Sequence, residues 1–172
     1  AVGASWADYD NDGLLDLFIP GSGGTSNLFF HNEGAGIFTR ILDSPISTAG
    51  GFSVGSCWGD IDNDGDLDLF VANNSNRNNA LFINNGGQFT QRLTGIEVNN
   101  QGQSHGCSFA DVDNDADLDL YVTNDSGVKF LYYNNGLGVF TRNTTELITQ
   151  NFGKSLGHAW SDFDRDGDLD LF

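Results

Sequence analysis

The chain has 172 residues, of which 24 are aspartate or glutamate and 7 are lysine or arginine, so its formal net charge is −17. A chain this acidic offers no electrostatic footprint for nucleic acid or for an anionic membrane surface. It has no run of 18 apolar residues, so we expect no transmembrane helix and no membrane insertion.

An acidic segment recurs along the chain at a fixed interval. The segment starts at Asp8, Asp60, Asp111 and Asp162. A constant period of about 50 residues indicates a repeat architecture. The sequence therefore predicts a single domain, residues 1–172, made of repeats at approximately 1–51, 52–103 and 104–154 and an incomplete repeat at 155–172.

Each repeat opens with a predicted strand that ends at the first aspartate. These strands are expected at residues 2–8, 52–60, 105–111 and 156–162. The residue two positions before the aspartate is always aromatic (Trp6, Trp58, Phe109 and Trp160), and the residue five positions before it is always glycine (Gly3, Gly55, Gly106 and Gly157). A large aromatic ring at one position and glycine at another favour an inner strand that packs closely against the neighbouring strands. We expect the four rings to belong to the core and not to form sugar-stacking platforms.

Three further strands follow in each complete repeat. The second strands are predicted at 15–19, 67–72, 118–123 and 169–172, the third at 27–31, 80–83 and 128–133, and the fourth at 37–42, 88–93 and 139–142. Asparagine- and glycine-rich turns at 32–36, 84–87 and 134–138 predict hairpins between the third and fourth strands. Because helical periodicity appears nowhere, the predicted fold class is all-β.

The direction of the strands assigns each loop to one of two ends. In an up-and-down sheet, the acidic segments and the third-to-fourth-strand hairpins share one end, which we call the aspartate end. The linkers at 20–26, 73–78 and 124–127 share the other end, the variable end, with the connections at 43–51, 94–104 and 143–155. The aspartate end repeats closely and is expected to be scaffold. The variable end differs between repeats, so we expect a ligand there.

The acidic segments have the pattern D-x-D-x-D-G-x-x-D, with Ala116 in place of the glycine in the third copy. Four carboxylates within nine residues repel one another unless a cation lies between them. Hard oxygen ligands from positions 1, 3, 5 and 9, with a backbone carbonyl from position 7, suit Ca²⁺. The sequence therefore predicts about four calcium ions, one in each segment.

Two other calcium-binding folds are alternatives, of which the EF-hand has a loop that starts in the same way. An EF-hand needs glutamate at position 12 and flanking helices, whereas position 12 is Ile19, Val71 or Val122 and the flanks are β-prone. A calcium β-roll has a nonapeptide period, which this chain lacks. Both alternatives are rejected.

The recurring loop resembles the FG-GAP/VCBS-type repeats of integrin-like β-propellers, whose signature is D-x-D-x-D-G-x-x-D-L within a four-stranded blade. The resemblance covers essentially the whole chain. It implies a propeller of about seven blades, of which this chain holds three full blades and a half blade with an open edge. We expect a fragment of a larger propeller, or copies that assemble into a ring.

The resemblance also implies the residues that ligate calcium. The implied carboxylate ligands are Asp8, Asp10, Asp12 and Asp16; Asp60, Asp62, Asp64 and Asp68; Asp111, Asp113, Asp115 and Asp119; and Asp162, Asp164, Asp166 and Asp170. The position-7 carbonyls belong to Leu14, Asp66, Asp117 and Asp168. If position 6 has positive φ, Ala116 costs on the order of 1 kcal/mol, so we expect the third loop to bind calcium most weakly.

The cysteines and histidines carry weaker signals. Cys57 lies three residues before its repeat's first aspartate and Cys107 lies four before, so the two side chains face opposite sides of equivalent strands. We therefore expect two small buried thiols and not a disulfide between neighbouring blades. His31, His105 and His158 lie in different strand contexts and indicate no shared site.

These features favour a non-catalytic, extracellular module for adhesion or recognition, because millimolar extracellular calcium fills weak sites. The integrin-like resemblance implies a protein ligand, and a similarity to calcium-decorated fungal lectin propellers implies a carbohydrate. Another chain could complete the propeller. The alternatives are a structural subunit of a surface layer or filament, joined by strand addition, and the scaffold of a polysaccharide-acting enzyme. Four equivalent carboxylate sets argue against one asymmetric catalytic site.

Overall fold

The computed structural model describes residues 3–150 and 152–172 and contains three four-stranded sheets. The first sheet holds β1 (Ser5–Ala7), β2 (Asp16–Ile19), β4 (Leu28–Asn32) and β5 (Phe38–Ile41); the second holds β7 (Ser53–Gly59), β8 (Asp68–Asn73), β9 (Ala80–Asn85) and β10 (Gln88–Arg92); the third holds β11 (Ser104–Ala110), β12 (Asp119–Asn124), β13 (Phe130–Tyr133) and β14 (Thr141–Asn143). Val2, where the first predicted strand begins, and Asn151, within the last predicted connection, lie outside the described residues.

Within each sheet, strands that are consecutive along the repeat pair antiparallel, as the up-and-down prediction requires. A two-stranded sheet of β15 (Trp160–Ser161) and β16 (Asp170–Leu171) follows, and β3 (Thr25–Ser26) pairs with β6 (Gly50–Gly51). The all-β prediction and the three complete repeats are confirmed. The sheets of the described residues do not close into a ring.

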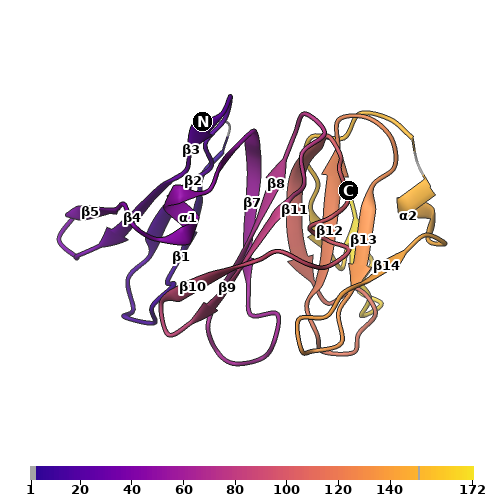
Figure 1. Ribbon diagram of the computed structural model, residues 1–172. Coiled ribbons are helices and arrows are strands. Elements are labelled where there is room, and N and C mark those ends of the chain that lie inside the picture. Colours follow the sequence, from indigo (N-terminus) through magenta and orange to yellow (C-terminus); the bar gives the residue numbers. More distant parts are fainter. Residues whose placement is uncertain (1–2, 151) are drawn as a thin grey trace.

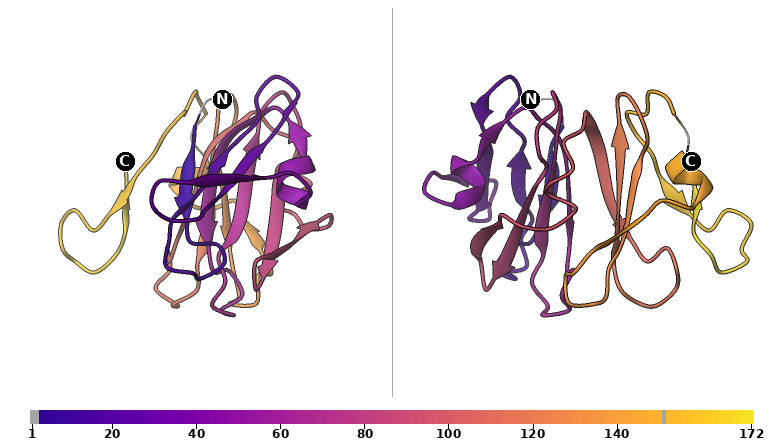
Figure 2. Two further views of the ribbon diagram at one scale, coloured as in Figure 1. Left: turned by 90° about the vertical axis from the view of Figure 1, so that its left-hand side faces the viewer. Right: turned by 45° about the vertical axis from the view of Figure 1, so that its right-hand side comes forward.

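The three large sheets follow one another along the molecule, with the second between the first and the third (Figure 1). The β15–β16 hairpin lies at the edge of the molecule in the left view of Figure 2, and Trp160 of β15 contacts the third sheet through the Tyr121 ring and the Ser108 hydroxyl. Every residue of β8 is buried, because successive side chains point to opposite faces of the second sheet and a neighbouring sheet covers each face. Leu69 and Val71 pack in a cluster with the first sheet, and Phe70 and Ala72 pack in a cluster with the third.

The apolar clusters between sheets hold the repeats together. Phe18 and Phe29 of the first sheet meet Phe82 of the second, and all three are essentially inaccessible to solvent. Burying a side chain of this size contributes roughly 1.5–3 kcal/mol. Polar bonds repeat with the same period: Asn84 Nδ2 donates to the Tyr9 carbonyl at 2.7 Å. Asn134 Nδ2 donates to the Ile61 carbonyl at 2.8 Å.

The expectation that the four aromatic residues before the loops are core is correct for Trp58 and Phe109 and wrong for Trp6, whereas Trp160 is partly buried against Tyr121 of the third sheet. Trp58 and Phe109 pack against the clusters between sheets. The ring of Trp58 contacts Phe18 and Phe29 of the preceding sheet. Among the described residues no sheet precedes the first one, and Trp6 is 52% exposed. An aromatic ring at this position is buried only when a neighbouring repeat covers it. A pattern within one repeat therefore does not show whether the ring is buried.

The glycines five residues before the loops lie where inner strands approach closely. A Cβ built on Gly55 would lie 2.2 Å from the His105 carbonyl oxygen of β11, a contact that no real Cβ makes. A Cβ on Gly106 would lie 3.1 Å from the Leu156 carbonyl oxygen. The predicted crowding of the inner strands is therefore confirmed at these two positions.

We expect Gly55→Ala to destabilise the protein by about 1–3 kcal/mol, because β7 and β11 must separate to admit the methyl group. Urea unfolding measures this change. Gly157→Ala is the matched control: it lies at the equivalent position with nothing within 4 Å of its Cβ, and we expect a change within about 0.5 kcal/mol. Equal stability of the two variants would contradict the close approach.

The expected placement of the two cysteines needs correction. The side chains do face opposite sides of equivalent strands, but neighbouring sheets stack face to face, so opposite sides meet. Both residues pack against the cluster between the second and third sheets, where they are free thiols. Burial and a hydrogen bond with the Cys107 thiol raise the pKa of Cys57 well above its ordinary value. Cys107 Sγ also lies 3.9 Å from the Phe70 carbonyl oxygen.

Two one-turn helices, α1 (Pro45–Thr48) and α2 (Leu147–Gln150), form in connections that were expected to lack helix. α1 starts with proline at its first turn, which suits a helix start. Before α2, Asn143 Oδ1 accepts hydrogen bonds from the Thr145 and Glu146 amides. Four residues are too few to produce a helical period in a sequence. No described helix has the length and apolar character needed to cross a membrane.

Candidate metal sites

Each acidic segment forms a loop between the first and second strands of its repeat, which agrees with the rejection of an EF-hand. The position-1 carboxylate organises the loop. Asp8 Oδ1 accepts the Asp12 amide at 3.0 Å, and Asp8 Oδ2 accepts the Gly13 amide at 2.9 Å. Asp60, Asp111 and Asp162 accept the equivalent pairs of amides. The position-5 carboxylates of Asp12, Asp64, Asp115 and Asp166 accept the position-7 amides.

The position-9 carboxylate starts the second strand and is deeply buried in the first three repeats. Asp16, Asp68 and Asp119 are each at most 2% exposed. Asp68 accepts the Ile61 amide of its own loop at 3.2 Å and the Asn84 amide of β9 at 2.7 Å. Asp16 and Asp119 accept the equivalent pairs, and Asp170 accepts the Phe163 amide. This position therefore ties the loop to the sheet as well as contributing a candidate ligand.

The structure brings three predicted ligands of each loop together, with one carboxylate oxygen from each within 4.8 Å of the others. The groups are Asp8, Asp10 and Asp16; Asp60, Asp62 and Asp68; Asp111, Asp113 and Asp115; and Asp162, Asp164 and Asp170. In the part of the chain described, the buried Oδ1 atoms of Asp10 and Asp62 have no hydrogen-bond partner. A buried carboxylate oxygen without a donor suits coordination of a cation, so the loops fit a divalent metal.

Burial within these clusters disfavours the charged carboxylates. Burial raises the pKa of Asp68 from 3.8 to about 7 and that of Asp119 to about 6, and neighbouring aspartates add to both shifts. The pKa values of Asp16, Asp62 and Asp113 are raised by the same causes. A bound cation would offset the repulsion that raises them.

Position 7 has a second role that sequence reasoning missed. The position-4 asparagine of each of the first three loops reaches the position-7 aspartate of the next. Asn11 Nδ2 donates to Asp66 Oδ1 at 2.9 Å, Asn63 Nδ2 to Asp117 Oδ1 at 3.1 Å, and Asn114 Nδ2 to Asp168 Oδ1 at 2.6 Å. These bonds link neighbouring loops along the aspartate end. The recurrence of Asn at position 4 was the signal for them. Leu14 is the only position-7 residue without a carboxylate.

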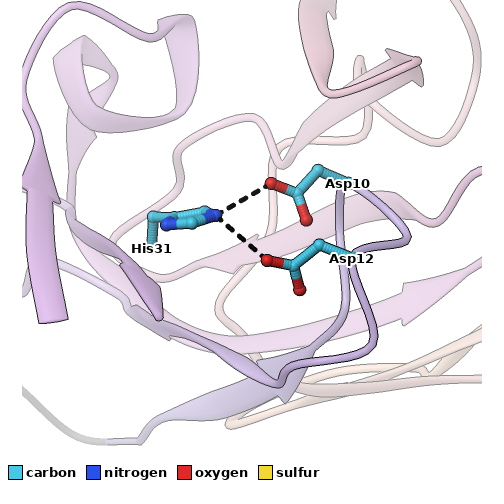
Figure 3. A group of neighbouring side chains, drawn as sticks. All are labelled: Asp10, Asp12 and His31. Carbon is cyan, nitrogen blue, oxygen red and sulfur yellow. Dashed lines mark ion pairs between the residues drawn. The ribbon is translucent and has the colours of Figure 1, made fainter. Parts of the chain in front are cut away.

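Sequence reasoning also missed a histidine at the first loop. His31 of β4 directs Nε2 toward Asp10 and Asp12, at 3.0 Å from Asp10 Oδ2 and 3.5 Å from Asp12 Oδ2 (Figure 3). Its pKa is lowered by burial but raised overall by Asp10, Asp16 and Glu33. The signal lay in topology: the third strand runs antiparallel to the second, so its end returns to the loop that precedes the second strand.

His158 lies in a different environment, against the inner strand of the third sheet. Its Nε2 is 2.5 Å from Ser108 Oγ, and its ring packs edge-on against Tyr121. Burial lowers its pKa. His31 and His158 therefore lie in separate environments, and His31 belongs to a cluster of its own.

Position 6 has positive φ in all four loops, as the turn requires. The values are +89° at Gly13, +92° at Gly65, +73° at Ala116 and +99° at Gly167. Alanine in this region carries a steric cost on the order of 1 kcal/mol. At position 6, the third loop thus carries strain that the other three loops lack.

We expect Ala116→Gly to raise the divalent-cation affinity of the third loop up to about fivefold, the equivalent of ~1 kcal/mol. The expected gain follows from relief of the positive-φ strain in the folded loop. Calcium titration followed by site-resolved NMR measures it. Gly65→Ala should weaken the second loop by a similar factor. An unchanged third loop in Ala116→Gly would contradict the strain argument.

The variable end has a polar pocket between the first and second repeats. It measures about 400 Å³ and is formed by the second-to-third-strand linker of the second repeat, by the connections before and after that repeat, and by parts of the adjacent strands. Its amide side chains come from Asn27, Asn73, Asn76, Asn78, Asn79, Gln91 and Gln101. Arg77 lines it and lies over the Phe52 ring at 5.4 Å. The end predicted to differ between repeats thus contains a hollow lined by neutral hydrogen-bonding groups and one charged side chain, Arg77.

Comparison with protein families assigns the repeats. A model of the FG-GAP-like repeat matches the chain three times, over residues 8–71, 60–122 and 111–172. Each match starts at the first aspartate of a loop, and the first two end within the second strand of the following repeat. A comparison with curated protein sequences finds no match.

Proposed function

Because the chain belongs to the FG-GAP-like repeat family, we propose that it is a calcium-stabilised, non-catalytic recognition module of propeller-like construction. The observation that carries this proposal is the convergence of three carboxylates in every one of four loops that recur in phase. Identical sites at a fixed period stabilise a scaffold, whereas a catalytic centre is a single asymmetric constellation.

Calcium is the proposed ion because the donors are carboxylate oxygens. Ca²⁺ takes six to eight oxygen ligands in flexible geometry. Positions 1, 3, 5 and 9 supply carboxylates, and the carbonyls of Leu14, Asp66, Asp117 and Asp168 remain the proposed fifth ligands. In this role calcium screens carboxylates whose burial is otherwise unfavourable, and its binding is coupled to folding of the loop.

The variable end is the proposed ligand-binding surface. The pocket beside Arg77 supplies amide donors and acceptors together with a cation held against an aromatic ring. Such neutral polar groups suit a hydroxyl-rich glycan or the backbone of a protein loop. We favour a protein ligand because the amide pattern of this pocket does not recur in the linker at 124–127.

FG-GAP repeats are typical of extracellular proteins, and we propose that this module works outside the cell, where calcium is abundant. We also propose that the three sheets are blades of a larger propeller completed by further repeats or by a second chain. The exposed Trp6, whose counterpart Trp58 packs on a preceding sheet, supports this arrangement.

Native mass spectrometry in calcium, and again after chelation, tests the proposal. We expect the mass of the chain plus four calcium ions, or a multiple of it, and loss of those ions with EGTA. Protein without bound calcium would overturn the proposal. Ligand binding is tested on glycan arrays and on purified extracellular-matrix proteins, with Arg77→Ala against Arg40→Ala as a charge-matched control. Binding that survives substitution of Asn74, Asn76 and Arg77 would exclude their linker as the binding surface.

A further inference from the structure

We propose that the first loop holds a mixed carboxylate–imidazole site, formed by Asp10, Asp12 and His31, that binds a borderline divalent metal ion of the Zn²⁺ class. One ligand atom from each of the three residues lies within 4.8 Å of the other two. The inference goes beyond the proposed calcium scaffold because it gives one loop a different metal preference from the others.

The three ligand atoms already have the spacing of a metal site. Zn²⁺ binds imidazole nitrogen and carboxylate oxygen at about 2.0–2.2 Å, so two ligands of a tetrahedral ion lie roughly 3.3 Å apart. The distances from His31 Nε2 to Asp10 Oδ2 and Asp12 Oδ2 are 3.0 and 3.5 Å, which bracket that value. Figure 3 shows the imidazole edge directed at both carboxylates.

The other side of the imidazole ring is held as in metal-ligating histidines. His31 Nδ1 lies 3.4 Å from Glu33 Oε1. A carboxylate at Nδ1 favours a proton on that nitrogen, so that Nε2 can give up its own proton and offer its lone pair to an ion held between the imidazole and the aspartates. The Tyr9 ring packs against the imidazole edge-on, with centroids 6.1 Å apart, and restricts its orientation.

The site is open to an incoming ion and has unused ligand capacity. The side chains of His31, Asp10 and Asp12 are between 23% and 34% exposed. Asp10 Oδ1 is buried and has no hydrogen-bond partner among the described residues. Three protein ligands leave the fourth position of a tetrahedral ion for water.

The second and third repeats have no imidazole nitrogen at the position of His31. The residue after His31 is Asn32, whose backbone N–H donates to the position-9 aspartate. Asn84 and Asn134 make the same backbone bond in the second and third repeats. The residue equivalent to His31 is therefore Ile83 in the second repeat and Tyr133 in the third. Calcium prefers oxygen ligands, whereas imidazole suits zinc, so the substitution changes which metal the loop favours.

Zinc titration of metal-free protein tests the inference, with the histidine side-chain ¹⁵N resonances as the readout. One equivalent of Zn²⁺ is expected to shift His31 Nε2 and to leave His105 and His158 unchanged. In His31→Ile, which installs the residue of the second repeat, zinc affinity at this loop should fall at least tenfold. His105→Ala is the control and should bind zinc as the wild type does.

A second variant tests the same geometry by gain of function. Ile83→His places an imidazole at the equivalent point of the second loop and should add one tight zinc site. An unshifted His31 Nε2 resonance, or unchanged zinc affinity in His31→Ile, would overturn the inference. Stabilisation by calcium is measured separately in the wild type. Zinc binding without stabilisation by calcium would refute only the proposed scaffold role. Stabilisation by calcium without zinc binding would refute only the zinc site.

Discussion

Chelation of calcium is expected to lower the midpoint of thermal unfolding by roughly 15 °C or more. An ion present at 100 times its dissociation constant stabilises a folded protein by about 2.7 kcal/mol per site. In a chain of this size, each kcal/mol moves the midpoint by about 2–4 °C. The clustered carboxylates of the loops repel one another when the ion leaves, so several sites contribute together.

Calorimetry in calcium and in EGTA measures this loss, and re-addition of calcium should restore the original midpoint. Asp62→Asn isolates one site, because Asp62 Oδ1 has no hydrogen-bond partner to lose among the described residues. We expect this variant to lose the contribution of one ion, about 2.7 kcal/mol at the same excess. Asp43→Asn removes an exposed carboxylate outside the loops and is the charge-matched control. Identical midpoints with and without calcium would refute a stabilising ion.

Without calcium, the protein is expected to become more stable as the pH falls from 8 toward 5. The pKa of Asp68 is raised from 3.8 to about 7 in the folded protein, mainly by burial. Between those values the folded state binds more protons than the unfolded state, so acidification favours folding. Each pKa unit corresponds to ~1.4 kcal/mol, which gives an effect of a few kcal/mol. Asp119, with a pKa of about 6, adds to it in the same direction.

In the presence of calcium, the pH dependence of stability should have the opposite sign. Protons compete with the ion for the same carboxylates, so the calcium-loaded protein should lose stability as the pH falls through this range. Urea unfolding at several pH values, with and without EGTA, gives the two curves. Asp68→Asn should flatten the metal-free curve, whereas Asp43→Asn should keep its slope. A metal-free slope that is unchanged in Asp68→Asn would show that Asp68 does not cause it, because only the share that Asp119 contributes should remain in this variant.

Local sequence patterns were sufficient to predict the strands of the three four-stranded sheets and their repetition, but not the two one-turn helices. β-prone segments, asparagine- and glycine-rich turns and a constant period predicted the strands and the loops. Glycine at position 6 in three of the four copies raised the possibility of positive φ there, and all four loops have it. These features depend on residues within one repeat, where the chain's local geometry is decisive.

Tertiary structure decided the contacts between repeats. Period-two alternation shows that two side chains face opposite sides of a sheet, but it does not show which neighbouring sheet covers each side. For that reason Cys57 meets Cys107, and Trp6 is exposed while Trp58 is packed. His31 reaches the first loop because of the strand order. The bonds between Asn11 and Asp66, like their counterparts in later loops, join residues more than 50 positions apart, and only the stacking of whole sheets brings such residues together.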